Sequence, residues 1–121
     1  GPLLFDLGTD RLNPEVKSFL KTLSGVIRQT PYDVNVIGHT DDQPIRNLNF
    51  ASNWELSLMR AAKVAKHLID EGQVGPARFT VMGRSEYAPV APNSSEQNRS
   101  LNRRVEIIIT RNISSSAETG T

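Results

Sequence analysis

The chain has 121 residues, a length that fits one domain with its own hydrophobic core. Its formal net charge of +1, with 22% charged residues, excludes a broad basic surface, so we expect no nucleic-acid partner. The absence of cysteine excludes disulfides and thiolate metal sites. No apolar run in the sequence approaches the length of a membrane span.

Three regions are expected along the chain. Gly1-Pro2 resembles the remnant left by a tag-cleaving protease, which predicts a piece of a longer protein whose membrane or targeting segment lies elsewhere. One globular domain is predicted over residues 3–111. Residues 112–121 are polar and rich in serine, and a disordered tail is expected there.

The first half of the domain is predicted to fold as strand, helix and strand. The apolar run Leu3–Phe5 is a candidate edge strand. Asn13 suits an N-cap and Pro14 the first helical position, and apolar residues then recur at helical spacing. Tyr32–Gly38 partly alternates, which indicates a strand, and residues 40–51 predict an exposed loop. The apolar face of the first helix is predicted to comprise Val16, Phe19, Leu20, Leu23, Val26 and Ile27.

A second helix is predicted to begin after Ser52, because Ser52 and Glu55 form a capping box. Alanines in its apolar stripe predict a close approach to a sheet. Asn53, Ser57 and Arg60 lie on a polar flank beside that stripe, as expected of the edge of a binding site. The stripe itself is predicted to comprise Trp54, Leu58, Ala61, Ala62, Ala65, Leu68 and Ile69.

Two further strands are predicted, over 79–83 and 103–111. The residues between them form a long loop, with one helical turn expected near 95–98. In the last strand Ile108 interrupts the polar positions, which indicates partial cover of the second face of the sheet. The order of elements predicts an α/β (α+β) two-layer sandwich, in which two helices pack on one face of the sheet.

The segment Gly38-His39-Thr40-Asp41-Asp42 places Asp41 at the end of a predicted strand, and Arg60 lies on the helix that follows. A carboxylate accepts hydrogen bonds from an ammonium, and a guanidinium presents a planar fork to a carboxylate. Asp41 and Arg60 therefore suit a ligand that carries both groups. Arg103 and Arg104 add guanidinium groups near the last strand, and alternation sends their side chains to opposite faces.

Other interpretations of these residues predict different chemistry. Asp41 after a strand also suits a turn cap, and Arg60 suits a solvated or structural ion-pair residue. His39 and Asp41 with the distant His67 supply too few converging ligands for a zinc site. A hydrolase would need an exposed nucleophile on a Gly-x-Ser-x-Gly turn, which the sequence lacks. Trp54 suits a sugar platform, but its place in the apolar stripe favours the core. We therefore predict no catalytic residue, no metal and no cofactor.

Three ordered motifs resemble those of the OmpA-like peptidoglycan-binding domain, from about Leu3 to Arg111. They are Gly38-His39-Thr40-Asp41, Asn53-x-x-Leu56-Ser57-x-x-Arg60-Ala61 and Asn102-Arg103-Arg104-Val105-Glu106. Within that family the chain is most similar to the C-terminal periplasmic domain of MotB/PomB-type flagellar stator proteins, on the helix opening Ser52-Asn53-Trp54-Glu55 and the long connection before it. One departure is Ser85, which stands where the family often has a glycine.

The resemblance implies an OmpA-like βαβαββ mixed sheet and a non-catalytic domain that anchors the flagellar stator to the cell wall. It implies that Asp41 and Arg60 hold the diaminopimelate of the peptidoglycan stem peptide. Thr40, Asn53 and Arg104 are further expected ligand residues.

The implied partners are a second copy in a homodimer and MotA-type stator subunits, reached through an N-terminal part outside this sequence. The implied location is the periplasmic domain of a single-span inner-membrane protein. The alternative is an OmpA/Pal-like envelope anchor outside the flagellar motor.

Overall fold

The computed structural model describes residues 3–111, so Gly1-Pro2 and the tail predicted over 112–121 lie outside the described residues. None of the helices in the described part is both long and apolar enough to cross a membrane. In chain order the elements are β1 (Leu3–Leu4), α1 (Pro14–Arg28), β2 (Asp33–Gly38), α2 (Asn53–Asp70), the 3-10 turn η1 (Pro76–Arg78), β3 (Phe79–Gly83), α3 (Glu96–Asn102) and β4 (Arg104–Thr110).

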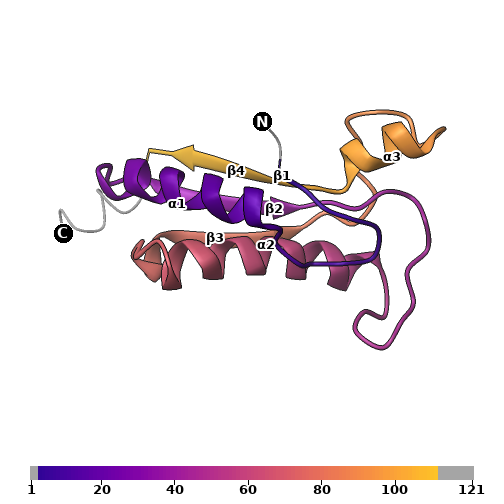
Figure 1. Cartoon of the computed structure of the whole chain (residues 1–121), viewed down its shortest axis with the longest axis horizontal. Coiled ribbons are helices and arrows are strands. Elements are labelled where there is room, and N and C mark those ends of the chain that lie inside the picture. The colour runs from indigo at the N-terminus through magenta and orange to yellow at the C-terminus, as the bar shows by residue number, and fades with distance from the viewer. Residues whose placement is uncertain (1–2, 112–121) are drawn as a thin grey trace.

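The four strands form one mixed sheet in the order β1-β4-β2-β3. β2 and β3 are parallel, whereas β4 pairs antiparallel with both β1 and β2. α1 and α2 lie side by side along the sheet, and α3 lies beyond one end of it (Figure 1). The two-layer α+β class predicted from the sequence is confirmed.

The core lies between the two long helices and the sheet. Val34, Val36 and Val105 of the central strands are buried on the helix side, where they meet Leu20 of α1 and Leu68 of α2. The side chain of Asn13 accepts a hydrogen bond from the backbone N–H of Val16, which confirms the predicted cap of α1. The core thus fixes the strand ends that bear the motif residues.

Several apolar residues are more exposed than their patterns predicted. Phe19 and Val26 of α1 are 42% and 56% exposed, so both lie at the margin of the buried face. Ile108 of β4 is 44% exposed, and the second face of the sheet is open at this position. The single helical turn expected near 95–98 is the seven-residue helix α3, capped by Ser95.

The buried face of α2 is rotated from the predicted stripe. Trp54 is 53% exposed and does not lie in the core, which corrects the prediction for that residue. The polar flank Asn53, Ser57 and Arg60 is buried instead. The polar flank is buried because α2 approaches β2 closely. The approach is so close that a Cβ atom at Gly38 would lie 1.8 Å from the carbonyl oxygen of Ser57. Ser57 therefore sits directly against the sheet.

Candidate functional site

Thr40 and Asp41 follow the end of β2 at Gly38, Asn53 and Arg60 lie in α2, and Arg104 begins β4. The loops following β1, β2 and β3 gather at the end of the sheet where the parallel strands β2 and β3 finish (Figure 1). Asp41 is 2% exposed. Its Oδ2 forms an ion pair of 2.9 Å with Nη1 of Arg103, and its Oδ1 accepts a hydrogen bond from the backbone N–H of Gln43. The carboxylate is thus held in place from two directions.

Arg103 joins Asp41 to α3. Its Nη2 lies 2.8 Å from Oε2 of Glu96, and its Nε donates to the carbonyl oxygen of Phe5. Burial lowers the pKa of the Arg103 guanidinium, but its hydrogen bonds with Glu96 and Asp41 outweigh burial and raise the pKa above its ordinary value. The Arg103 hydrogen bond also lowers the pKa of Glu96. The resemblance implied Arg104 as a ligand residue, and the sequence left open which of Arg103 and Arg104 faces the site; in the structure Arg103 pairs with Asp41.

Arg60 is fully buried beside this pair. Its Nε, Nη1 and Nη2 donate to the carbonyl oxygens of Thr9, His39 and Asp6 at 2.8–2.9 Å. The guanidinium carbon also lies 5.3 Å from the centre of the Phe5 ring. Burial lowers the pKa of the Arg60 guanidinium to about 10, although the charge of Asp41 opposes the shift. The residue stays charged at neutral pH, beneath a cover formed by the segment Asp6–Thr9.

Thr40 and Asn53 hold the loop that carries Asp41. The Thr40 hydroxyl donates to the carbonyl oxygen of Asp41, and the Thr40 N–H donates to the carbonyl oxygen of Ser85. The Asn53 amide donates to the carbonyl oxygen of Gln43 at 3.0 Å and to that of Asp41 at 3.5 Å. The Asn53 Oδ1 atom is buried with no partner among residues 3–111. A hydrogen-bond donor supplied by a ligand would therefore satisfy the Asn53 Oδ1 atom.

The side chain of Arg104 lies on the opposite side of the strand from that of Arg103, because side chains alternate along a strand. Its Nη2 donates to the carbonyl oxygen of Ala88 and lies 3.6 Å from Oε1 of Glu106. The same Glu106 oxygen lies 2.6 Å from Nε2 of His39. Burial lowers the pKa of Arg104, and its buried Nε and Nη1 have no partner within the described residues.

Asp41, Arg60, Thr40 and Asn53 thus come together, while Arg104 lies on the other side of its strand. We call the group of Asp41, Arg60 and Arg103 the charged cluster. It holds one buried carboxylate and two buried guanidinium groups, with Glu96 at its exposed margin. Because positive charge is in excess among the buried groups, the charged cluster favours an additional anionic group such as a carboxylate.

Ser85 keeps the backbone geometry expected of the glycine it replaces. Its φ angle is +52°, in the left-handed region that glycine adopts at little cost. Its backbone N–H donates a hydrogen bond of 3.0 Å to the hydroxyl oxygen of Ser57. The turn after β3 is therefore held against α2 despite the serine.

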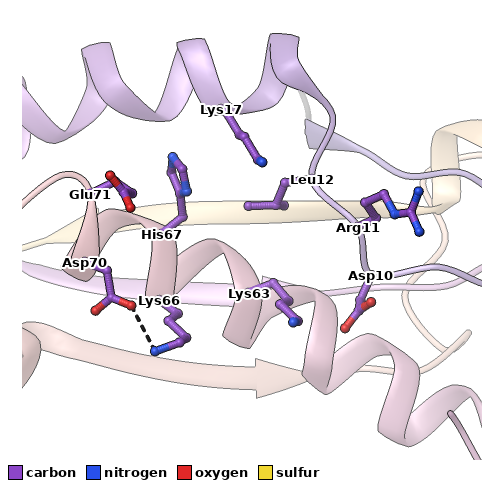
Figure 2. Close-up of a pocket in the computed structure, with 9 residues that line it drawn as sticks. All are labelled: Asp10, Arg11, Leu12, Lys17, Lys63, Lys66, His67, Asp70 and Glu71. Carbon is purple, nitrogen blue, oxygen red and sulfur yellow. Dashed lines mark ion pairs between the residues drawn. The ribbon is translucent and has the colours of Figure 1, made fainter.

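A separate open groove of about 400 Å³ runs between α1 and α2, and none of the predicted site residues lines it. Figure 2 shows both basic and acidic side chains around it, and Lys66 and Asp70 pair at 2.9 Å. The lining residues are Asp10, Arg11, Leu12, Lys17, Lys63, Lys66, His67, Asp70 and Glu71. Over the described part of the chain, no three His, Cys, Asp or Glu side chains gather closely enough to hold a metal ion.

The fold of this chain, a four-stranded mixed sheet under two helices, is similar to that of solved structures. The chain belongs to the OmpA family, whose model matches residues 4–103.

Among proteins of this family, the chain is similar to Motility protein B of Bacillus subtilis, with 38% identity over 108 residues that cover 88% of this chain and 41% of that protein. The crystal structure of the C-terminal domain of Helicobacter pylori MotB matches with a TM-score of 0.86 at 30% identity, covering 99% of this chain and 92% of that one. The structure of the cell wall anchor of the T6SS from Pseudomonas aeruginosa matches with a TM-score of 0.77 at 38% identity, covering 89% and 75%. The chain spans about two-fifths of the length of the Motility protein B relatives.

Proposed function

We propose that this chain is a non-catalytic peptidoglycan-binding domain, located in the periplasm, that anchors a flagellar stator complex to the cell wall. The observation that supports it most directly is the charged cluster, in which Asp41 meets Arg60 and Arg103 beyond the ends of two strands. The likeness to MotB over nearly the whole chain supports the stator assignment. A homodimer and MotA-type subunits are the proposed partners, and one inner-membrane span is proposed for the rest of the protein.

We propose that the ligand is the diaminopimelate of the stem peptide, held by Asp41 through its ammonium and by Arg60 through its carboxylate. Because Arg60 is covered, the segment Asp6–Thr9 has to move aside before the ligand reaches it. Thr40 and Asn53 position the Asp41 loop. Arg104 lies on the other side of its strand from Asp41, and we propose that it contacts a separate part of the ligand through Nε and Nη1, which are buried and unpaired among the described residues.

The test is co-sedimentation with purified sacculi, comparing the wild type with Asp41→Asn. The substitution keeps the shape of the side chain but removes the charge that pairs with Arg103 and with an ammonium. We expect the bound fraction to fall at least about tenfold, because a charge-assisted hydrogen bond contributes about 1.5–3 kcal/mol. Asp42→Asn, at the exposed neighbouring carboxylate, is the matched control and should bind like the wild type.

Circular dichroism of each variant separates lost binding from lost structure. A folded Asp41→Asn variant that pellets as well as the wild type would exclude Asp41 from the site. A wild type that stays in the supernatant, even when joined to a second copy through a fused dimerisation domain, would refute the proposed function.

The second candidate function is that of an OmpA/Pal-like wall anchor outside the motor. It is supported by the similarity to the cell wall anchor of the T6SS and to outer membrane porin F of Pseudomonas fluorescens. Deleting the gene distinguishes the two: loss of swimming with the flagellar filament intact supports the stator assignment, and unchanged swimming supports the other anchor.

A further inference from the structure

Two large aromatic rings are exposed beside the candidate site. Trp54 is 53% exposed and Tyr87 is 62% exposed. Their ring centres lie 5.5 Å apart with planes inclined by 35°. The pair therefore presents a preformed aromatic surface to solvent, and an exposed apolar patch of this kind marks a binding site on many soluble proteins.

The two rings adjoin a groove of about 480 Å³ between α2 and the edge strand β3, which we call the aromatic groove. Trp54 and Leu58 line it from α2, and Val81 and Met82 line it from β3. Glu55 and Arg84 add one acidic and one basic group. An apolar floor with a few polar groups at its margin is the usual composition of a small-molecule site.

The aromatic groove is continuous with the charged cluster through two segments of backbone. Trp54 directly follows Asn53, whose amide holds the Asp41 loop. On the opposite side, the Thr40 N–H donates to Ser85 and the Arg84 N–H donates to Gly38. The loop that carries Tyr87 is thus bonded to the strand end that leads into Asp41.

We propose that the aromatic groove binds a sugar ring of the glycan strand, the one from which the stem peptide in the charged cluster extends. The inference rests on the proposed function, because it assigns a second part of the same ligand. One face of a pyranose ring consists of C–H groups, which pack against the rings of Trp54 and Tyr87. The acetamido and hydroxyl groups of an N-acetylated amino sugar find hydrogen-bond partners in Glu55 and Arg84.

A sugar fits the aromatic groove better than a second copy of the chain does. A stable protein interface takes roughly 20–30 residues a side. Seven residues line this groove, and two of them are charged. The groove is therefore suited to a ligand of small area with both apolar and polar faces.

The experiment compares two ligands that differ in the sugar. One is a disaccharide–stem peptide released from peptidoglycan by a muramidase. The other is the same peptide after an amidase has hydrolysed the amide to the disaccharide, with the amino group that this frees acetylated so that no new charge is introduced. Trp54 is the single tryptophan of the chain, so its fluorescence reports directly on the aromatic groove. We expect a change in Trp54 emission with the disaccharide–peptide and none with the free peptide.

Trp54→Ala and Tyr87→Ala provide the second measurement, by calorimetric titration of both ligands. Each substitution should lower the affinity for the disaccharide–peptide about tenfold and change the affinity for the free peptide by less than about twofold. Phe19→Ala, at an exposed aromatic residue of α1 outside the groove, is the matched control and should change neither. If Trp54→Ala does not fold, Tyr87→Ala and the wild-type fluorescence still test the proposal.

Equal weakening of both ligands, or of neither, overturns this inference while the proposed function stands. Dissociation of a dimer by Trp54→Ala with unchanged binding of the disaccharide–peptide also overturns it and assigns the groove to a second copy. If the wild type binds neither ligand, the proposed function fails, and this inference fails with it.

Discussion

Arg60 joins three segments that are far apart in the sequence. Its guanidinium donates to Asp6 and Thr9 before α1 and to His39 after β2. Lysine retains the charge but cannot reproduce this planar set of donors. We therefore expect Arg60→Lys to lower the free energy of unfolding by about 2–4 kcal/mol, as measured by urea denaturation.

Arg46→Lys, at an exposed arginine of the β2–α2 loop, is the control and should change stability by less than about 0.5 kcal/mol. An Arg60→Lys protein as stable as the wild type would show that the three carbonyl contacts contribute little. The expected result means that a binding assay on an Arg60 variant is informative only when folding is measured beside it. Asp41→Asn is the cleaner probe of the ligand.

At the scale of elements, the contact between α2 and β2 depends on Gly38. A Cβ atom there would meet the backbone of Ser57 at 1.8 Å, and backbone cannot rotate out of the way. We expect Gly38→Ala to move α2 off the sheet and to lower the free energy of unfolding by about 3 kcal/mol, as measured by thermal or urea unfolding.

Gly25 in α1 provides the matched control. A Cβ atom at Gly25 would have no neighbour closer than Nη2 of Arg28, at 3.9 Å. Alanine should therefore stabilise the helix there by about 0.5–1 kcal/mol. Similar effects of the two substitutions would contradict the close approach of α2 at Gly38.

The positions of the helices and strands were largely predictable, because caps and periodicity are local signals. Asn13 and Ser52 both cap the helices that they were expected to cap. Which face of α2 is buried was not predictable in the same way. A periodicity of apolar residues ignores buried polar ones, and Ser57 and Arg60 are buried because backbone groups from other segments satisfy them.

At the scale of the whole molecule, His39 makes stability depend on pH. Burial, together with the charges of Arg104 and Arg84, holds the His39 pKa below 6.5 despite its hydrogen bond with Glu106. Below pH 6.5 the unfolded chain therefore binds a proton that the folded chain does not. The free energy of unfolding should therefore fall as the pH is lowered below 6.5. Urea unfolding between about pH 7.5 and 5.5 measures the slope of this free energy against pH.

His39→Gln should flatten that slope, whereas His67→Gln, at the other histidine of the chain, is the control for substituting a histidine. A slope that is the same in wild type and His39→Gln would contradict the assignment. Glu96 does not interfere, because its pKa is lowered from 4.5 and its contribution is lost only at more acidic pH.

The assembly of the charged cluster was only partly predictable from the sequence. The motif placed Asp41 beyond a strand and Arg60 on the next helix, and the structure brings them together. The sequence named Arg103 and Arg104 without showing which one faces Asp41. That choice depends on the register of β4 against β1 and β2, which is a long-range property.

The position of β1 and of the segment that follows it determines how the domain responds to a pulling force. β1 has only two residues, and the chain that follows it supplies the carbonyl oxygens that bind Arg103 and Arg60. A pulling force applied on the N-terminal side of Leu3 would therefore load these arginine contacts directly after peeling β1 from β4. Tension along the chain would in this way draw Leu3 and Phe5 out of the core and loosen the cover over Arg60 before the rest of the core unfolded.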